Sequence, residues 1–160
     1  MEKLDFSRVG SDEEIYLQIQ KLVDDGFLTS KQADTVKYRN IFRILNTSVG
    51  KKMCEFSQSL KREYSFKYLM DASELDGSVV SCDKIVVQGM IDAYFEDSLG
   101  NVVIVDYKTD KVTKGPEEIK ERYMAQMKYY KIALEKVFEK KVSAAYLFLL
   151  DSGDVVECNV

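Results

Sequence analysis

Apolar and polar residues follow two different spacings along this chain, and the change comes near residue 60. Before that point, apolar residues recur every three or four positions, as they do in amphipathic helices. Residues that commonly cap helices stand at the start of these segments, and Gly26 ends the first one. The pattern predicts three helices, over residues 11–26, 29–45 and 46–63.

Further along, apolar and polar residues alternate in short runs, which is typical of strands. The segment DSLG joins two such runs and is a hairpin signal, while the run VSAAYLFLL is typical of a strand covered on both faces. A strongly helical segment at residues 117–140 follows Pro116. The sequence predicts strands at residues 63–70, 84–96, 101–109, 142–150 and 155–160, with a loop or short turn at 72–83.

The order of these elements indicates the fold class. Helices come first, followed by three strands, a long helix and two strands. A helix that crosses over before the strand at residues 142–150 favours a mixed sheet, in an α/β or α+β core. At 160 residues and 18.4 kDa, the chain can bury one hydrophobic core, so we expect a single domain.

The composition excludes several kinds of site. The chain has no histidine, which rules out histidine-based nucleophilic triads and histidine metal sites within it. Its three cysteines, Cys54, Cys82 and Cys158, lack CxxC spacing, so we expect no zinc site and no iron–sulfur cluster. No GxxxxGKS/T segment occurs, so we expect no nucleotide site. Without a secretory signal or an apolar run of about 20 residues, we expect a cytoplasmic protein with no membrane partner.

Two aspartates and a lysine stand on the predicted hairpin, which is otherwise rich in apolar and aromatic residues. If the hairpin loop is centred near Leu99, the numbers of paired residues sum to 198 and Asp92 lies opposite Asp106. Lys108 then shares the face of Asp106, because side chains alternate along a strand. The other face is expected to be apolar, with Ile91, Ala93, Phe95, Val103, Val105 and Tyr107.

Two carboxylates held this close repel each other unless something neutralises them. A hard divalent cation with oxygen ligands and retained waters, such as Mg²⁺, suits such a pair. Water activated by a metal can act as a nucleophile at neutral pH, and Lys108 could position that water or polarise a phosphate oxygen. The alternative, of equal weight from the spacing, is structural: Lys108 forms a salt bridge between two surface aspartates, Asp92 and Asp106.

A second polar cluster lies on the long predicted helix, where Tyr123, Gln126 and Tyr130 share one face. Glutamine can bond a phosphate or a base edge, and tyrosine can stack on a base; alternatively, the aromatic residues pack on the sheet. Residues 106–141 hold 10 basic and 7 acidic residues, a net charge of +3, against −7 for the rest. Basic residues near the start of this helix could therefore hold a DNA backbone or could simply be solvated. They are Lys111, Lys114, Lys120 and Arg122.

Three short motifs occur in a specific order: GMID at residues 89–92, DYKT at 106–109 and QMKYY at 126–130. In this order and spacing they resemble the RecB-like branch of the PD-(D/E)XK nucleases, which have a restriction-endonuclease-like core. The segment KREYSFKY resembles the family's strand before the active site, where a glutamate corresponding to Glu63 is common. The segments QIQKLVDDGFLTSKQADTV and IFRILNTSVGKKM extend the resemblance to the nuclease domains of AddAB-type helicase–nucleases.

The resemblance implies a DNA exonuclease that hydrolyses phosphodiester bonds with Mg²⁺ or Mn²⁺ during double-strand-break resection. Asp92 and Asp106 would be metal ligands, together with the backbone carbonyl of Tyr107, and Lys108 would be the catalytic lysine. Further residues are predicted to support the site or to contact DNA: Gln126, Tyr130, Tyr123, Lys111 and Glu63. The implied partners are DNA and, through a longer parent protein, an AddB-type subunit in a heterodimer.

The sequence departs from this family in one respect. RecB-like nucleases usually have a histidine upstream of the first strand that completes the metal shell, and this chain has none. We therefore expect either a fragment of a larger helicase–nuclease or a divergent domain, and an inactive isolated chain is one expected outcome. Residues 1–160 would form one RecB-like nuclease domain, with a helical part at 1–60 and a catalytic core at 61–160. The alternative function is a non-catalytic module that docks on DNA or on a partner.

Overall fold

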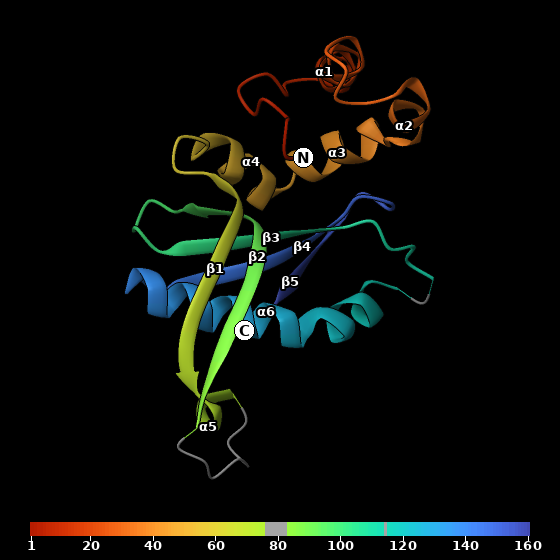
Figure 1. Cartoon of the computed structure of the whole chain (residues 1–160). Coiled ribbons are helices and arrows are strands. Elements are labelled where there is room, and N and C mark those ends of the chain that lie inside the picture. Colours follow the sequence, from red (N-terminus) through yellow and green to blue (C-terminus); the bar gives the residue numbers. More distant parts are fainter. Residues whose placement is uncertain (76–82, 114) are drawn as a thin grey trace.

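In the computed structural model, which describes residues 1–75, 83–113 and 115–160, helices precede a mixed sheet of five strands (Figure 1). The helices are α1 (Asp12–Asp24), α2 (Ser30–Thr35), α3 (Tyr38–Leu45), α4 (Ser48–Glu55), α5 (Ala72–Leu75) and α6 (Pro116–Phe138). The strands are β1 (Lys61–Asp71), β2 (Lys84–Glu96), β3 (Val102–Lys108), β4 (Val142–Leu149) and β5 (Asp154–Cys158). The predicted fold class is confirmed, whereas the predicted loop at 72–83 lies largely outside the described residues.

The strands lie side by side in the order in which they occur in the chain. β1, β2 and β3 pair antiparallel, β4 pairs parallel with β3, and β5 pairs antiparallel with β4. The parallel pair needs a crossover connection, and α6 supplies it. The carboxyl ends of β3 and β4 therefore meet at the same end of the sheet, where ligands bind in open α/β sheets.

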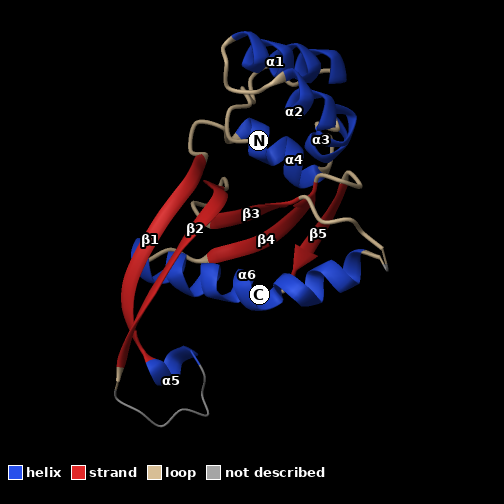
Figure 2. Ribbon diagram, turned by 45° about the vertical axis from the view of Figure 1, so that its right-hand side comes forward, coloured by secondary structure: helices blue, strands red, loops and turns tan. Residues whose placement is uncertain are grey.

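Helices cover both faces of the sheet, with α1 to α4 on one side and α6 on the other (Figures 1 and 2). Phe95 and Phe148 pack with the N-terminal helices, whereas Ile104 and Leu147 pack with α6. β3 is consequently buried on both faces from residue 102 to residue 105, which explains its uninterrupted apolar run. In the described part of the chain, no helix has the length and the apolar character needed to cross a membrane.

The helix predicted over residues 29–45 is wrong in one respect, because the structure has two helices there. α2 ends at Thr35, and the C-cap residue Val36 has an extended ψ of 117°. Val36 packs against the apolar cluster between the N-terminal helices and the sheet, and α3 begins at Tyr38. The third predicted helix is also too long, because β1 already begins at Lys61.

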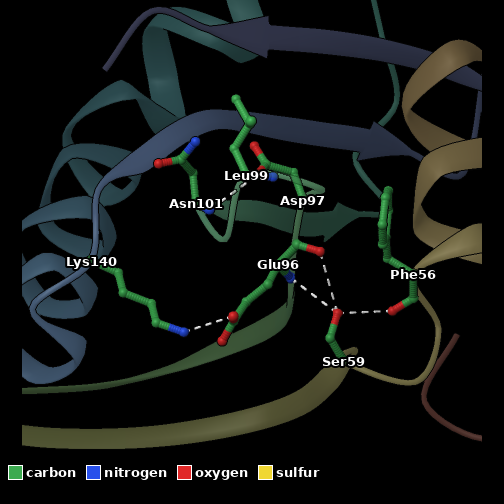
Figure 3. Close-up of polar contacts among 7 residues, drawn as sticks. All are labelled: Phe56, Ser59, Glu96, Asp97, Leu99, Asn101 and Lys140. Carbon is green, nitrogen blue, oxygen red and sulfur yellow. Dashed lines mark hydrogen bonds and ion pairs between the residues drawn. The ribbon is translucent and has the colours of Figure 1, made fainter.

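The turn between β2 and β3 confirms the predicted register of the hairpin. The residue numbers of the four ladder pairs sum to 198, and Glu96 and Val102 form the pair next to the turn. Asp97 closes the turn, because its Oδ1 accepts hydrogen bonds from the backbone N–H groups of Leu99 and Asn101 (Figure 3). Local turn chemistry therefore sets the alignment of the two strands.

The side-chain alternation of β1 and β2 breaks at Glu63 and Asp92. The ladder between these strands skips both residues, which would otherwise be partners, and Glu63 has a left-handed φ of 49°. As a result, Ile91 lies with Tyr94 on the α6 side, although Ala93 lies on the side of the N-terminal helices. The prediction that Ile91 shares a face with Ala93 is wrong, because strict alternation does not hold across Asp92.

Candidate metal and nucleic-acid site

Asp106, near the carboxyl end of β3, is the one charged residue with a buried side chain among the described residues. Its Oδ2 forms an ion pair with Lys108 Nζ at 2.6 Å, and no other described residue donates a hydrogen bond to this oxygen. Burial raises the pKa of the Asp106 carboxyl against the opposing effect of Lys108, and the negative charge of Asp92 raises it further. Such a carboxyl group is typical of functional sites.

Asp92 reaches the same region from β2. Its Oδ2 accepts a hydrogen bond of 2.8 Å from the backbone N–H of Tyr107, the residue that follows Asp106. The β2–β3 ladder ends at Ala93 and Val105, so the predicted ladder pair between Asp92 and Asp106 is not formed. The Asp92 side chain therefore bonds the backbone of β3 next to Asp106, although the two aspartates do not form a ladder pair.

A pocket of about 150 Å³ opens beside Asp92. Its lining consists of Met1, Glu2, Glu63, Asp92, Tyr107 and Leu150. Glu63 is exposed, and its left-handed backbone costs a residue with a side chain roughly 1–2 kcal/mol. Backbone strain of this kind gathers at functional sites, which supports the predicted place of Glu63 at this one.

Lys108 is held by two residues of α6 in addition to its ion pair on β3. Its Nζ donates to Gln126 Oε1 at 3.0 Å and lies 4.0 Å from the centre of the Tyr123 ring. Gln126 Nε2 donates to the Tyr130 hydroxyl at 2.6 Å, and that hydroxyl donates to the Met90 carbonyl at 2.7 Å. Burial raises the pKa of Tyr130 to about 12, so the hydroxyl keeps its proton. These bonds direct the amide oxygen of Gln126 at the ammonium group, and the predicted shared face on α6 is confirmed.

Gly89, the first residue of the GMID motif, has a packing role. It pairs with Phe66 on β1, and a Cβ atom at this position would lie 2.8 Å from Phe66 Cζ. The Phe66 ring packs edge to face against Tyr130, with ring centroids 6.0 Å apart. Because residue 89 lacks a side chain, Phe66 can support the tyrosine that orients Gln126.

Asp110 is a site residue that the sequence analysis missed. Its Oδ2 accepts a hydrogen bond of 3.0 Å from the Tyr123 hydroxyl, and its Oδ1 accepts one of 2.9 Å from Arg122 Nη1. Asp110 therefore fastens the segment after β3 to α6, on the side where Tyr123 contacts Lys108. The sequence signal for this role is modest, namely an acidic residue two positions after Lys108.

The other predicted residues lie around this centre or outside the described chain. Lys111 is exposed, as a contact with a DNA backbone requires, and Lys114 is outside the described residues. The structural alternative for Lys108 is formed in part: the ion pair with Asp106 is present, but Asp106 is buried rather than at the surface, and Asp92 bonds a backbone N–H group. The catalytic and ligand roles assigned from the sequence stay predictions.

The residues present fit a hard divalent cation. Carboxylate oxygens on two neighbouring strands are ligands that Mg²⁺ prefers, and the buried Asp106 Oδ2 has no partner among the described residues besides Lys108. In residues 1–75, 83–113 and 115–160, no group of three or more histidine, cysteine, aspartate or glutamate side chains could hold a metal ion. Asp92 and Asp106 would therefore share the ion with water and phosphate oxygens, as Mg²⁺ sites usually do.

The five-stranded mixed sheet, with two aspartates and a lysine on neighbouring strands, defines the class of protein. The family model of the PD-(D/E)XK nuclease superfamily matches residues 11–158, and the chain belongs to this superfamily.

Several proteins that are similar to this chain are named as subunits of ATP-dependent helicase/nucleases. The chain is 39% identical to an ATP-dependent helicase/nuclease subunit of Thermoanaerobacter sp. (strain X514), over 98% of this chain and 13% of that protein. It is 39% identical to the relative of the same name from Acetivibrio thermocellus and 35% identical to that from Clostridium botulinum (strain Loch Maree), over 98% of this chain and 12% of each relative. The chain thus spans 12–13% of the length of these relatives.

Proposed function

We propose that this chain is a metal-dependent nuclease domain that hydrolyses phosphodiester bonds in DNA. The single observation that carries this proposal is the buried Asp106, whose Oδ2 has Lys108 Nζ, 2.6 Å away, as its one partner among the described residues. Lys108 offsets only part of the cost of burying this carboxylate, because burial still raises the pKa of Asp106, and a bound metal ion would offset the rest. Nucleases of the PD-(D/E)XK superfamily generally use divalent metal ions, which supports Mg²⁺ or Mn²⁺ as the cofactor here.

In this proposal, Asp92 and Asp106 hold the ion, and the Tyr107 carbonyl is a further ligand. When bound, the ion activates water and offsets negative charge on the phosphate. Lys108 donates to a phosphate oxygen or to the attacking water, and Gln126 fixes the direction of its ammonium group. Positioning and charge stabilisation account for most of the catalysis in such a site.

We place this domain in a longer helicase–nuclease that acts as an exonuclease during resection of double-strand breaks. The relatives, each named as part of an ATP-dependent helicase/nuclease, support this setting. The proposal includes a cytoplasmic location and an AddB-type partner subunit. Residues 1–160 act as one nuclease domain, because the N-terminal helices pack on the sheet that carries Asp92 and Asp106.

A second candidate is a non-catalytic module that binds DNA or a partner with the same fold. It is favoured by the small set of ligands, since the chain has no histidine and the described residues show no group of three or more candidate ligands. Such a module would keep its DNA binding when Asp106 is replaced.

Degradation of end-labelled DNA tests the proposal. The chain, and the same domain within the longer helicase–nuclease, are incubated with Mg²⁺, with Mn²⁺ or with EDTA. We expect metal-dependent degradation that Asp106→Asn abolishes, and that Asp97→Asn at the turn end of the hairpin leaves unchanged. DNA binding without degradation under all these conditions would favour the binding module.

A further inference from the structure

A larger pocket neighbours the one beside Asp92, and the two linings share Leu150. The larger pocket has a volume of about 340 Å³, which is at the lower end of the range for small-ligand sites. We call it the Leu150 pocket; Leu150, Val36 and Ile41 form its apolar part, and Thr35 and Thr109 also line it. It lies between α2, α3 and the carboxyl ends of β3 and β4.

The charges in the Leu150 pocket are balanced. Lys37 Nζ forms an ion pair with the Asp151 carboxylate and also donates to the Asp151 carbonyl at 3.0 Å. Both residues line the pocket. With its lysine already paired, the pocket offers little attraction to a phosphate group. An apolar floor with neutral polar groups instead suits a flat, uncharged ring.

One wall of the pocket is held in place and connected to Lys108. Asn40 Nδ2 donates to the carbonyl oxygens of Leu150 and Asp151, at 3.2 and 2.7 Å. The Leu150 N–H donates to the Lys108 carbonyl at 2.8 Å, and Thr109 follows directly in the chain. The pocket is therefore attached to the strand end that carries the lysine, and Figure 1 shows the β4–β5 turn beneath α3.

We propose that the Leu150 pocket binds the nucleobase of the nucleotide next to the phosphate held by Asp92, Asp106 and Lys108. This inference rests on the proposed nuclease function. It specifies that the polynucleotide bound at this site is single-stranded. The base lies against the apolar floor, while its phosphates stay at the ion and at Lys108. The Thr35 hydroxyl donates to the Gln32 carbonyl at 2.7 Å and can still accept a hydrogen bond, while the Thr109 hydroxyl can donate or accept, so the pocket tolerates every base.

Binding of single-stranded oligonucleotides tests this inference without requiring cleavage. Fluorescence anisotropy compares a labelled oligothymidylate with a series in which each position in turn lacks its base, in the presence of Ca²⁺. Contact with one base is expected to change affinity about fivefold or more. One position in the series should therefore bind at least about fivefold more weakly, and in Mg²⁺ or Mn²⁺ that position should neighbour the cleaved bond.

A variant that fills the pocket provides the second arm. Thr35 is exposed at the end of α2, and the indole of Thr35→Trp would occupy the space of the base. Thr35→Trp should bind intact DNA about as weakly as the wild type binds the critical abasic oligonucleotide, and should no longer distinguish the two. Ser30→Trp, on the exposed start of the same helix and outside the pocket lining, is the matched control and should behave like the wild type.

Two results would overturn the inference. The first is equal binding of intact and abasic oligonucleotides by the wild type, a result that does not depend on any variant. It would indicate that the pocket binds something else, such as a protein segment. The second is a folded Thr35→Trp protein that still prefers the intact oligonucleotide. Failure of the nuclease proposal would look different, because base-dependent binding would persist without any metal-dependent cleavage.

Discussion

The two ends of the β2–β3 hairpin contain similar residue types in opposite situations. At the turn end, polar groups are paired (Figure 3). Ser59 Oγ accepts a hydrogen bond of 3.1 Å from the Glu96 N–H, and Glu96 pairs with Lys140 Nζ at 2.6 Å. Asp97 accepts two backbone N–H groups and the Ser143 hydroxyl. These contacts stabilise the turn and leave few polar groups available for a ligand.

At the open end, the same two strands carry carboxylates with fewer partners, one hydrogen bond to Asp92 and one ion pair to Asp106. The ladder stops before Asp92, and the buried Asp106 Oδ2 has no partner besides Lys108 among the described residues. Glu63, opposite Asp92, holds a left-handed backbone conformation. The comparison shows that the contacts at the turn end stabilise the fold. The open end instead keeps a buried charge and a strained backbone, which lower stability, as functional sites commonly do.

The largest expected effect separates two lysines, one paired with a carboxylate at each end of the hairpin. Lys108 Nζ and Lys140 Nζ each lie 2.6 Å from a carboxylate oxygen. Lys108→Ala should slow cleavage at least about a hundredfold, or about 3 kcal/mol, because a positioned cation beside the reacting phosphate is lost. Lys140→Ala should change the rate less than about twofold, because an exposed ion pair contributes little.

Both variants are best compared in the longer helicase–nuclease, with Mg²⁺ and with any nuclease of the partner subunit inactivated. Degradation and ATP-driven unwinding are followed in the same reaction, and unwinding should persist in Lys108→Ala. Normal degradation by Lys108→Ala would show that this lysine is a structural ion-pair residue like Lys140.

At the turn end, Asp97→Ala should affect stability and not cleavage. It removes acceptors for two backbone N–H groups, and we expect the free energy of unfolding to fall by about 1–2 kcal/mol. Burial opposes ionisation, but hydrogen bonds from Asn101, Leu99 and Ser143 outweigh it and lower the pKa of Asp97.

Because the pKa of Asp97 is lower in the folded state, its ionised form stabilises the fold above the unfolded value of about 3.9. This contribution is lost as the pH falls through the folded pKa. Urea unfolding of the wild type and of Asp97→Ala at several pH values should therefore show a difference that shrinks below about pH 4. A difference that stays constant with pH would contradict the hydrogen-bonded role of the carboxylate.

A smaller effect compares two glutamates with left-handed backbones, Glu63 at φ 49° and Glu139 at φ 52°. Glutamate pays a steric penalty there that glycine does not, although glycine loses more chain entropy on folding. Glu139→Gly, after the end of α6, should raise the free energy of unfolding by about 0.5–1 kcal/mol without changing cleavage. Glu63→Gly should give a similar gain but slow cleavage, and thermal melting with a cleavage assay measures both. Unchanged cleavage by Glu63→Gly would remove Glu63 from the site.

The smallest expected effect concerns the hydrogen bond between Asp110 and Tyr123. Tyr123→Phe keeps the ring 4.0 Å from Lys108 Nζ but loses the bond to Asp110, so we expect cleavage to slow by about fivefold at most. Tyr123→Ala also loses the ring and should slow it further. Rates for Tyr123→Phe, Asp110→Asn and the double variant form a thermodynamic cycle. Fully additive effects would show that the two residues act independently.

The parts predicted from the sequence are those set by local chemistry. The length of the turn after Glu96 fixes the register of the hairpin, and the apolar run of β4 indicates burial on both faces. The helical spacing of Gln126 and Tyr130 correctly predicts their contact one turn apart. These features depend on residues that are close together in the chain.

The parts that were missed depend on contacts between distant segments. The helix break at Val36 accompanies the packing of Val36 against the apolar cluster formed by the N-terminal helices and the sheet, since neither proline nor glycine occurs there. The position of Ile91 follows from the break in alternation opposite Glu63, on another strand. The role of Asp110 requires α6 to lie beside the end of β3. None of these contacts leaves a periodic pattern in the sequence.

Isothermal titration of the chain with Mn²⁺ tests the central claim most directly, namely that the open end of the hairpin binds a divalent cation. We expect the wild type to bind Mn²⁺ weakly, because the two aspartates supply few ligands and water must complete the shell. Asp92→Asn and Asp106→Asn should each abolish the binding heat, whereas Asp97→Asn at the turn end should titrate like the wild type. The absence of binding by the wild type, or wild-type binding by either Asp92→Asn or Asp106→Asn, would contradict the account.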